Sequence, residues 1–534
     1  MKNKILILLI SLFTSQSIFS QEEFSVEIEE FSITDIPEVQ SYVWAKTSDG
    51  KWLIFGGRIE GLHRRQPFAA FDETGNNKNV FVIDPINDQV WTKSLSSLPS
   101  AIFEQLQSTN QNFYQRNNTL YIIGGYGYSA FLNDHITYPN LTAIDVDALA
   151  SAIINNSSIT SYFRQIADNN LAITGGQLGY LNNTFYLCGG QLFEGRYNPM
   201  GPNNGPGFIQ HYSNEIRKFE IVDNGTTMSI NNYSAIVDTA NFHRRDYNMS
   251  PQIFPNGDHG FTMFSGPFNN LQLPFLNTID ITETSYSASN PFQQYLSNYH
   301  SAKIPVYDEE NSTMHTIFFG GIAQYTMDDQ GVLLEDTEVP FVKTISIVTR
   351  KSDGTMVETK LDIEMPAFLG SGAEFIPVSD DSLFIENEIV NLNYITDRTL
   401  VGYIYGGIES SAKNIFFTNT GAESTASTKT FKVYLNKENQ NTSIVEASKQ
   451  NTFEMELFPN PTAEFINLKA NFSKNEKHTV VIYDLKGTEL KRIELKKING
   501  ENEVKLNISD LAMGDYIILL KTDTRASKMK FYRF

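Results

Sequence analysis

The residues best suited to chemistry in this sequence form a three-residue string, His-Arg-Arg, that occurs twice. The first copy lies at 63–65 and the second at 243–245, where Asp246 and Tyr247 follow it directly. An arginine guanidinium is a planar fork of donors that fits a carboxylate, and a tyrosine ring stacks on sugars and other ring faces. The strings therefore make a site for a glycan or an acidic sugar physically reasonable, while packing and hydrogen bonding inside the fold is the favoured interpretation of Arg244 and Arg245.

Signatures of known catalytic and metal sites are absent from the sequence. It contains no His-Glu-x-x-His, no pair of cysteines and no glycine-rich phosphate loop. The only cysteine, Cys188, lies in an apolar run that predicts a buried strand, so an inert thiol is expected. Two acidic loops, 308–311 and 328–331, lack the full spacing of calcium ligands and are interpreted as solvated. The sequence therefore predicts no metal and no cofactor, and any catalytic residue stays unknown.

Short apolar runs that end in two glycines are the elements that must position these residues. The run at 120–125, Leu-Tyr-Ile-Ile-Gly-Gly, is typical. Such runs favour buried strands, and a glycine pair at a strand end allows a positive φ or a close backbone approach. Six runs in order predict six copies of one small sheet, which must stack, most simply in a ring. The second glycines of the runs, of which the fourth run is degenerate, are Gly57, Gly125, Gly190, Gly266, Gly321 and Gly407.

The segment after the first glycine pair carries a longer pattern. A polar loop leads to Asn-Val-Phe-Val-Ile-Asp-Pro at 79–85 and then to Trp91, and fragments of this pattern follow at 141–145, 214–219 and 276–280. The pattern resembles the repeat of kelch proteins, although the repeats here exceed the usual length of about 50 residues. The resemblance covers residues 21–436 and implies an all-β, kelch-type β-propeller. Six blades are predicted, and seven are the alternative because the gap before the last glycine pair is long.

The last blade needs a strand from elsewhere in the chain. After the last glycine pair only two strands are expected, at 413–419 and 428–435. Residues 24–31 alternate in the manner of a strand. They are predicted to supply the fourth strand by pairing the first segment with the last, which leaves no open edge in the ring.

Charge and the N-terminal segment bear on partners and location. The formal net charge is −20, with the acidic excess in the middle of the chain, so nucleic acid is not expected as a partner. Residues 1–20 combine Lys2 and Lys4 with an apolar run and a small-residue cleavage site, which is typical of a secretory signal peptide. No later segment has the length of a membrane span. The sequence predicts an exported protein.

The C-terminal part has its own composition. Residues 437–452 are polar and aperiodic and are interpreted as a linker, and residues 453–534 hold six short alternating strands that predict a small β-sandwich. This module resembles the C-terminal sorting domain of type IX secretion cargo in Bacteroidetes. The resemblance implies that the partner is the type IX machinery and that the protein is secreted or held at the cell surface. The residues of the sorting motif that carry it are Phe458, Pro459, Asn460, Pro461, Gly514 and Tyr516.

Topology gathers the candidate ligand-binding residues on one rim of the predicted propeller. In a four-stranded meander, the loop after the second strand shares a face with the connection to the next blade. The loops after each glycine pair and the segments before each next inner strand should therefore line one rim. The candidates on this rim are Arg58, His63, Arg64, Arg65, Tyr126, Tyr128, Glu194, Arg196, Tyr197, His243, Arg244, Arg245, Tyr299 and His300.

Two classes of function fit these observations. The sequence favours a non-catalytic propeller that binds an extracellular glycan or protein, because no complete catalytic set is visible. The rival is a carbohydrate-active enzyme, such as a kelch-type sugar mutarotase or epimerase, with a galactose-oxidase-like enzyme less favoured because Cys188 is badly placed for a Tyr–Cys crosslink. A deep pocket that brings a histidine and a carboxylate close together would favour chemistry, and a shallow aromatic rim would favour binding.

Overall fold

The computed structural model describes residues 24–437 and 455–534, apart from 270, 290–291, 329, 387, 473–476, 485–488, 496–499 and 522–525. The predicted signal peptide lies outside the described residues, as does the predicted linker except for Lys437. The chain divides into two compact units, with the boundary after Lys437. None of the helices among the described residues has the length and apolar character needed to cross a membrane.

The first unit contains six antiparallel four-stranded groups that follow one another along the chain. The strands of the first group are β2 (Val43–Lys46), β3 (Trp52–Phe55), β4 (Asn79–Asp84) and β5 (Gln89–Ser94). Those of the second are β6 (Asn112–Arg116), β7 (Thr119–Ile123), β10 (Asn140–Asp145) and β11 (Phe163–Ala167). Those of the third are β12 (Gln177–Leu181), β13 (Thr184–Cys188), β16 (Glu215–Asp223) and β17 (Met228–Val237).

The remaining three groups repeat the same order. The strands of the fourth are β18 (Asn248–Ile253), β19 (His259–Phe264), β20 (Thr278–Ile281) and β21 (Tyr286–Ser289). Those of the fifth are β22 (Lys303–Asp308), β23 (Thr313–Ile322), β26 (Phe341–Arg350) and β27 (Met356–Glu364). Those of the sixth are β28 (Phe368–Pro377), β31 (Thr399–Ser410), β33 (Thr430–Lys437) and β1 (Phe24–Phe31).

Short elements fill the connections between these strands. Two helices, α1 (Ser100–Leu106) and α2 (Val146–Ile154), lie before β6 and after β10. The long connections of the second and third groups pair with each other in a small sheet of β8 (Tyr126–Ser129), β9 (Asp134–Thr137), β14 (Gln191–Glu194) and β15 (Ile209–Tyr212). The other short strands are β24 (Tyr325–Met327), β25 (Leu333–Glu335), β29 (Phe384–Ile385), β30 (Ile389–Asn391) and β32 (Ser424–Ala426).

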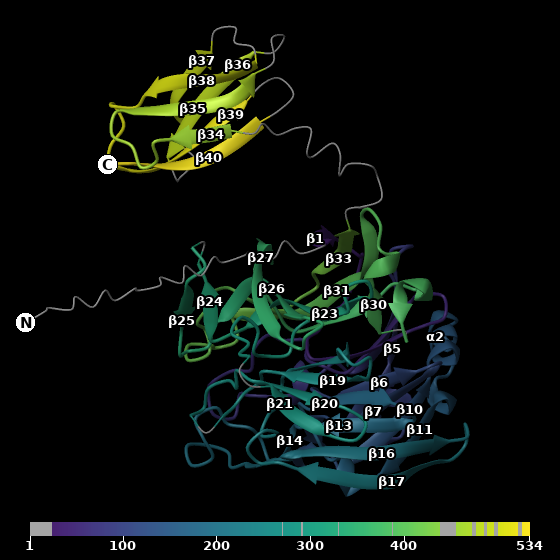
Figure 1. Cartoon of the computed structure of the whole chain (residues 1–534). Helices are drawn as coiled ribbons and strands as arrows, with labels where there is room; N and C mark the ends of the chain where they lie inside the picture. The colour runs from purple at the N-terminus through teal and green to yellow at the C-terminus, as the bar shows by residue number, and fades with distance from the viewer. Residues whose placement is uncertain are drawn as a thin grey trace, which may run out of the picture. The chain divides into compact units, whose positions relative to one another are not determined.

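The sixth group joins the two ends of the first unit. β1 pairs antiparallel with β33 along its whole length, with Phe24 opposite Lys437 and Phe31 opposite Thr430 (Figure 1). The predicted pairing of the first strand with the last is therefore confirmed. The predicted strand at 413–419 is wrong, because this segment forms turns. Its apolar side chains pack against the loop that carries His63 instead of joining a sheet.

The hydrophobic cores lie between consecutive sheets. Separate clusters join the first group to the second, the second to the third, and so on to the fifth and sixth. A further cluster joins the sixth group back to the first, with Tyr405 of β31 beside Trp52 of β3. Each small sheet thus buries its faces against its two neighbours, as expected for sheets that cannot form a core alone.

The glycine pairs mark the contacts between consecutive sheets. Both glycines of the pair at 124–125 have positive φ, at 68° and 95°, and a Cβ on Gly124 would lie 1.8 Å from the carbonyl oxygen of Ile173. The amide of Gly125 donates to that same carbonyl, just before the first strand of the next sheet. Gly57, Gly190 and Gly407 make equivalent hydrogen bonds to the segment before the next first strand. For Gly407 that segment precedes β2, so the sixth sheet is joined to the first.

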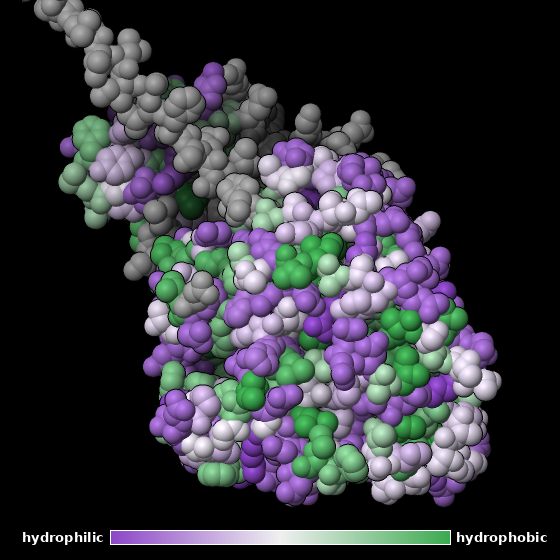
Figure 2. Space-filling view, turned by 90° about the horizontal axis from the view of Figure 1, so that it is seen from below, coloured by the Kyte–Doolittle hydropathy of each residue, from purple (hydrophilic) through white to green (hydrophobic). Residues whose placement is uncertain are grey.

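The outer surface is mixed in character. On the face shown in Figure 2, apolar side chains form small patches that polar side chains separate. Scattered apolar residues of this kind are normal on soluble proteins. This face therefore gives no sign of one large apolar docking surface.

The second unit consists of two sheets around a shared core. One sheet has β34 (Met455–Phe458), β35 (Phe465–Phe472) and β38 (Gly500–Asn507), and the other has β36 (His478–Asp484), β37 (Glu489–Leu495), β39 (Gly514–Lys521) and β40 (Ala526–Arg533). All six predicted strands are present, and the core takes residues from both sheets. Asn460 of the predicted sorting motif exchanges hydrogen bonds with β40, donating to Lys530 O and accepting from Tyr532 N.

Candidate functional site

A cavity of about 1100 Å³ lies where the first strands of the six sheets meet. The cavity is large enough to enclose a small-molecule ligand. Each first strand contributes to its wall, and the loops after the glycine pairs contribute to one end. One lining residue from each first strand, in chain order, is Trp44, Asn112, Gln177, Pro251, Lys303 and Glu374.

The structure separates the fourteen candidate residues into two halves. The candidates that line the cavity are Arg58, His63, Tyr126, Tyr197, Arg245, Tyr299 and His300. The candidates that do not line it are Arg64, Arg65, Tyr128, Glu194, Arg196, His243 and Arg244. Each His-Arg-Arg string thus contributes one side chain, a histidine from the first and an arginine from the second.

Arg244 is a packing residue. Its side chain is fully buried, and its guanidinium donates to Asn241 O at 2.8 Å, Ser265 O at 2.5 Å and Asn277 O at 2.8 Å. It also donates to Asn277 Oδ1 at 2.6 Å and lies over the ring of Phe275. These acceptors all belong to the connections around the fourth sheet. The interpretation favoured from the sequence, that this arginine serves packing and internal hydrogen bonding, therefore holds for Arg244.

Arg245 is only partly paired. Nη1 donates to Asp246 Oδ2 at 2.9 Å, Nε donates to the hydroxyl of Tyr212 at 3.2 Å, and the guanidinium lies over the ring of Phe268. Nη2 makes no hydrogen bond within the described part of the chain. The side chain lines the cavity with 18% of its surface exposed. The guanidinium is therefore fixed in orientation, and its Nη2 is free to donate to a ligand.

His63 forms part of the aromatic wall of the same cavity, and its ring is neutral. Its ring contacts the rings of Phe71, Tyr197 and Phe416 at centroid distances of 5.5, 5.2 and 5.7 Å. Burial lowers the pKa of His63 to about 4, and the charges of Arg245 and Arg58 act in the same direction. Nδ1 is buried and finds no hydrogen-bond partner among the described residues. At neutral pH this ring can therefore form a hydrogen bond with a ligand but cannot supply a positive charge.

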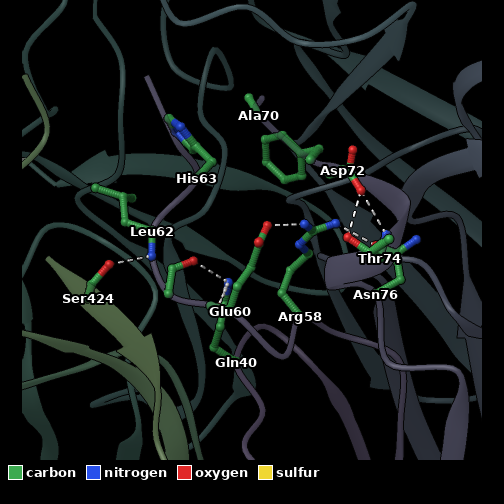
Figure 3. A network of polar contacts seen from close by, with 12 residues as sticks. Gln40, Arg58, Glu60, Leu62, His63, Ala70, Asp72, Thr74, Asn76 and Ser424 are labelled. Atoms are coloured by element: carbon green, nitrogen blue, oxygen red, sulfur yellow. Dashed lines mark hydrogen bonds and ion pairs between the residues drawn. The ribbon is translucent and has the colours of Figure 1, made fainter. Parts of the chain in front are cut away.

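The loop before His63 is fixed by a polar network (Figure 3). Arg58 is buried between Glu60 and Asn76, and its Nη1 donates to Asn76 Oδ1 at 2.6 Å. Gln40 donates to two loop carbonyls, and the amide of Leu62 donates to Ser424 Oγ at 2.9 Å. In Figure 3 the ring of His63 stands clear of these bonds. Arg58 thus holds the loop, although it lies at the cavity wall.

Two tyrosines are held by the paired connections of the second and third sheets. The hydroxyl of Tyr126 donates to Gly195 O at 2.8 Å and accepts from the amide of Tyr197 at 2.9 Å. Arg196 does not line the cavity and donates to Ala70 O and Asp72. The other candidates outside the cavity have partners of their own or are exposed. His243 stacks on Tyr212, Arg65 lies over Phe416 and Phe417, Tyr128 donates to Asn133, and Arg64 and Glu194 are exposed.

His300 belongs to a relay that sequence reasoning missed. Its Nδ1 lies 3.0 Å from Gln177 Nε2, and its Nε2 lies 2.8 Å from Glu374 Oε1. Gln177 and Glu374 come from the first strands β12 and β28, and both line the cavity. A deep cavity with a histidine and a carboxylate in contact is the arrangement that favours chemistry.

Lys303 was also missed. It begins β22 and lines the cavity, and burial lowers its pKa while the charge of Glu374 opposes that shift. Within the described residues its amine has no hydrogen bond and no carboxylate within 4.0 Å. Buried lysines are almost always paired. Charged residues inside otherwise apolar first strands were the signal in the sequence that would have identified both Lys303 and Glu374.

The contrast between Arg244 and Arg64 predicts a difference in stability. Replacing Arg244 by methionine should lower the free energy of unfolding by about 3 kcal/mol, because several buried acceptors lose their donor. Replacing exposed Arg64 by alanine should change it by less than about 0.5 kcal/mol. Denaturant titration of both variants checks this, and equal effects would contradict the packing role of Arg244.

Comparison with known proteins gives one informative match. No curated protein matches the chain. A solved structure titled "Structure of YjhT" is similar over 74% of this chain and 99% of that chain, at 11% sequence identity and a TM-score of 0.40. Residues 456–532 match the family described as the secretion system C-terminal sorting domain. That match indicates that type IX secretion exports the chain to the cell surface or the extracellular space.

Proposed function

We propose that the first unit is a six-bladed kelch-type β-propeller. Three observations support this architecture. The six sheets pack on one another in chain order, with the sixth against the first. Their first strands line a common cavity, and β1 completes the last sheet. Propellers bury sheet edges in this manner.

We further propose that this propeller binds a small anionic glycan, of the acidic-sugar class, outside the cell. The observation that carries the proposal is the half-paired guanidinium of Arg245 at the cavity wall. Asp246 and Tyr212 fix its orientation, so a ligand carboxylate can accept from Nη2 without a change of rotamer. The aromatic rings of Phe268, Tyr197 and Tyr299 surround this point and suit the apolar face of a sugar ring.

Matched sugars test this function directly. Glucuronate differs from glucose only at C6, where a carboxylate replaces the hydroxymethyl group. The wild-type protein should therefore bind glucuronate more tightly than glucose in calorimetric titrations. Galacturonate with galactose, and sialic acid, extend the comparison. Replacing Arg245 by methionine should weaken binding of the acidic sugar by about 10- to 100-fold, because a charge-assisted hydrogen bond contributes about 1.5–3 kcal/mol.

The control is Arg64→Ala, which removes an arginine from the first string without touching the cavity wall. This variant should bind as the wild type does. Equal binding of glucose and glucuronate, or full binding by Arg245→Met, would contradict the proposal.

A second candidate function is acid–base catalysis on the bound sugar, of the mutarotase or epimerase type. The contact between His300 Nε2 and Glu374 Oε1 inside the cavity favours it. Exchange NMR between the anomers of glucuronate measures such catalysis. The wild-type protein should accelerate the exchange, and Glu374→Gln should slow it by about 100-fold. Wild-type exchange at the uncatalysed rate with every sugar would leave binding as the function.

A further inference from the structure

Three side chains from different parts of the fold meet at the cavity wall. Gln177 opens β12, His300 precedes β22, and Glu374 lies in β28. His300 is also fixed through its backbone, because its amide donates to Asp246 O at 2.7 Å and its carbonyl accepts from Gly372 N at 3.0 Å. The imidazole therefore has a defined position between an amide and a carboxylate.

The partners of His300 determine where its proton lies. Gln177 Nε2 can only donate, so His300 Nδ1 at 3.0 Å must accept and carries no proton. The proton of the neutral ring is then on Nε2, which donates to Glu374 Oε1 at 2.8 Å. Glu374 Oε1 is therefore the acceptor of this contact. The relay thus runs from the donor amide of Gln177 through the imidazole of His300 to the acceptor oxygen of Glu374.

We propose that Glu374 is the proton acceptor of the cavity and that Gln177 and His300 are positioning residues, which hold its carboxyl group oriented. This inference rests on the acid–base function proposed above and assigns its roles. Both ring nitrogens of His300 are occupied, so the ring cannot itself take a proton from a ligand. Glu374 Oε2 makes no hydrogen bond among the described residues. It remains open toward the ligand.

The proton transfer is balanced within the cavity. The O–H bond of a ligand hydroxyl breaks, a new O–H bond forms at Glu374 Oε2, and the carboxyl becomes neutral. The negative charge passes to the ligand oxygen, where the unpaired amine of Lys303 and the open side of Arg245 can face it. For anomeric exchange, the carbonyl at the anomeric carbon forms as the ring C–O bond breaks, and the electron pair of that bond moves to the ring oxygen, which takes the proton back from Glu374 Oε2. Ring closure on the other face reverses these steps, so no oxidant, reductant or metal is required.

His243 provides an internal reference for this assignment. Its Nδ1 lies 2.9 Å from Asn214 Oδ1, which is an acceptor, so Nδ1 of His243 must carry the proton. The two histidines should therefore be opposite tautomers in the same protein. A measurement that reports both rings in one spectrum needs no external standard.

Long-range ¹H–¹⁵N correlation spectra of the full chain, with ¹⁵N-labelled histidine rings, test the tautomers. His300 should show an unprotonated Nδ1 and a protonated Nε2, and His243 the reverse; His300→Gln and His243→Asn identify the two sets of signals. In Gln177→Glu the new carboxylate must accept, so Nδ1 of His300 should become protonated. A protonated Nδ1 in the wild type, or an unchanged His300 in Gln177→Glu, would overturn the assignment.

Turnover is measured separately. Gln177→Glu should lower kcat of anomeric exchange at least tenfold with little change in KM, and Gln177→Met should lower it less, because it keeps the shape and removes only the donor. A change in KM with an unchanged kcat would refute the positioning role. Absence of exchange in the wild type would refute the acid–base function, whereas the spectra do not depend on any ligand. The two failures are therefore distinguishable.

Discussion

A chain that lacks residues 453–534 is expected to accumulate in the periplasm of a host with type IX secretion, while the full chain reaches the medium or the cell surface. The reason is that the deleted segment contains the whole match to the sorting domain. The first unit has its own cores and ends at Lys437, so the deletion leaves its packing intact. Immunoblots of periplasmic, surface and medium fractions give the distribution.

A point variant separates sorting from folding in this experiment. Asn460→Ala removes the two hydrogen bonds that tie the sorting motif to β40 and leaves the rest of the chain complete. It should reduce export less than the deletion does. Thermal unfolding of the truncated protein should show the transition of the first unit. Unchanged extracellular yield of the truncated protein would contradict the assignment.

Removal of β1 is expected to have the largest effect on stability. A chain that begins at Ser32 loses the whole β1–β33 pairing, and β33 becomes an open edge. Phe24 and Val26 are buried in the core between the fifth and sixth sheets, and each contributes about 1.5–3 kcal/mol. Together with the lost hydrogen bonds, at about 1 kcal/mol each, the loss should exceed about 5 kcal/mol.

The matched control keeps β1 and removes only the two of its charges that pair with Arg398. Glu27 and Glu29 pair with Arg398, whose side chain is 43% exposed. The double variant Glu27→Ala, Glu29→Ala should cost less than about 1 kcal/mol, because exposed ion pairs contribute little. Circular dichroism during thermal unfolding compares both with a chain that begins at Phe24. A deletion variant that unfolds like the control would show that the sixth sheet is stable without β1.

Local patterns in the sequence predicted the sheets because they depend on near neighbours. The glycine pairs take positive φ where the second strand of a sheet meets the segment before the next sheet, so each pair marked one sheet. The pairing of β1 followed from counting strands and avoiding an open edge. The prediction of a strand at 413–419 was wrong because its apolar residues are compatible both with a strand and with a loop that packs against the segment carrying His63.

The site was harder to predict because its members are distant in the chain. Topology placed His63, Arg245 and His300 at one cavity. It could not distinguish Arg244 from Arg245, since both lie in the irregular connection between β17 and β18 and only the packing shows which is buried. Gln177 was missed because a single uncharged polar residue in a strand carries no signal until the strand is known to face the cavity, whereas the charge of Glu374 inside an apolar strand was a signal that the analysis of loops and strand ends did not use.

The order of synthesis determines when the β1–β33 pair can form. β1 is made first, and its partner follows about 400 residues later, which at about 5–20 residues per second is on the order of a minute. During that interval β1 has no partner and the unit cannot be complete. The sorting domain is made only after β33. A chain interrupted before β33 therefore lacks both its closing strand and the sorting domain.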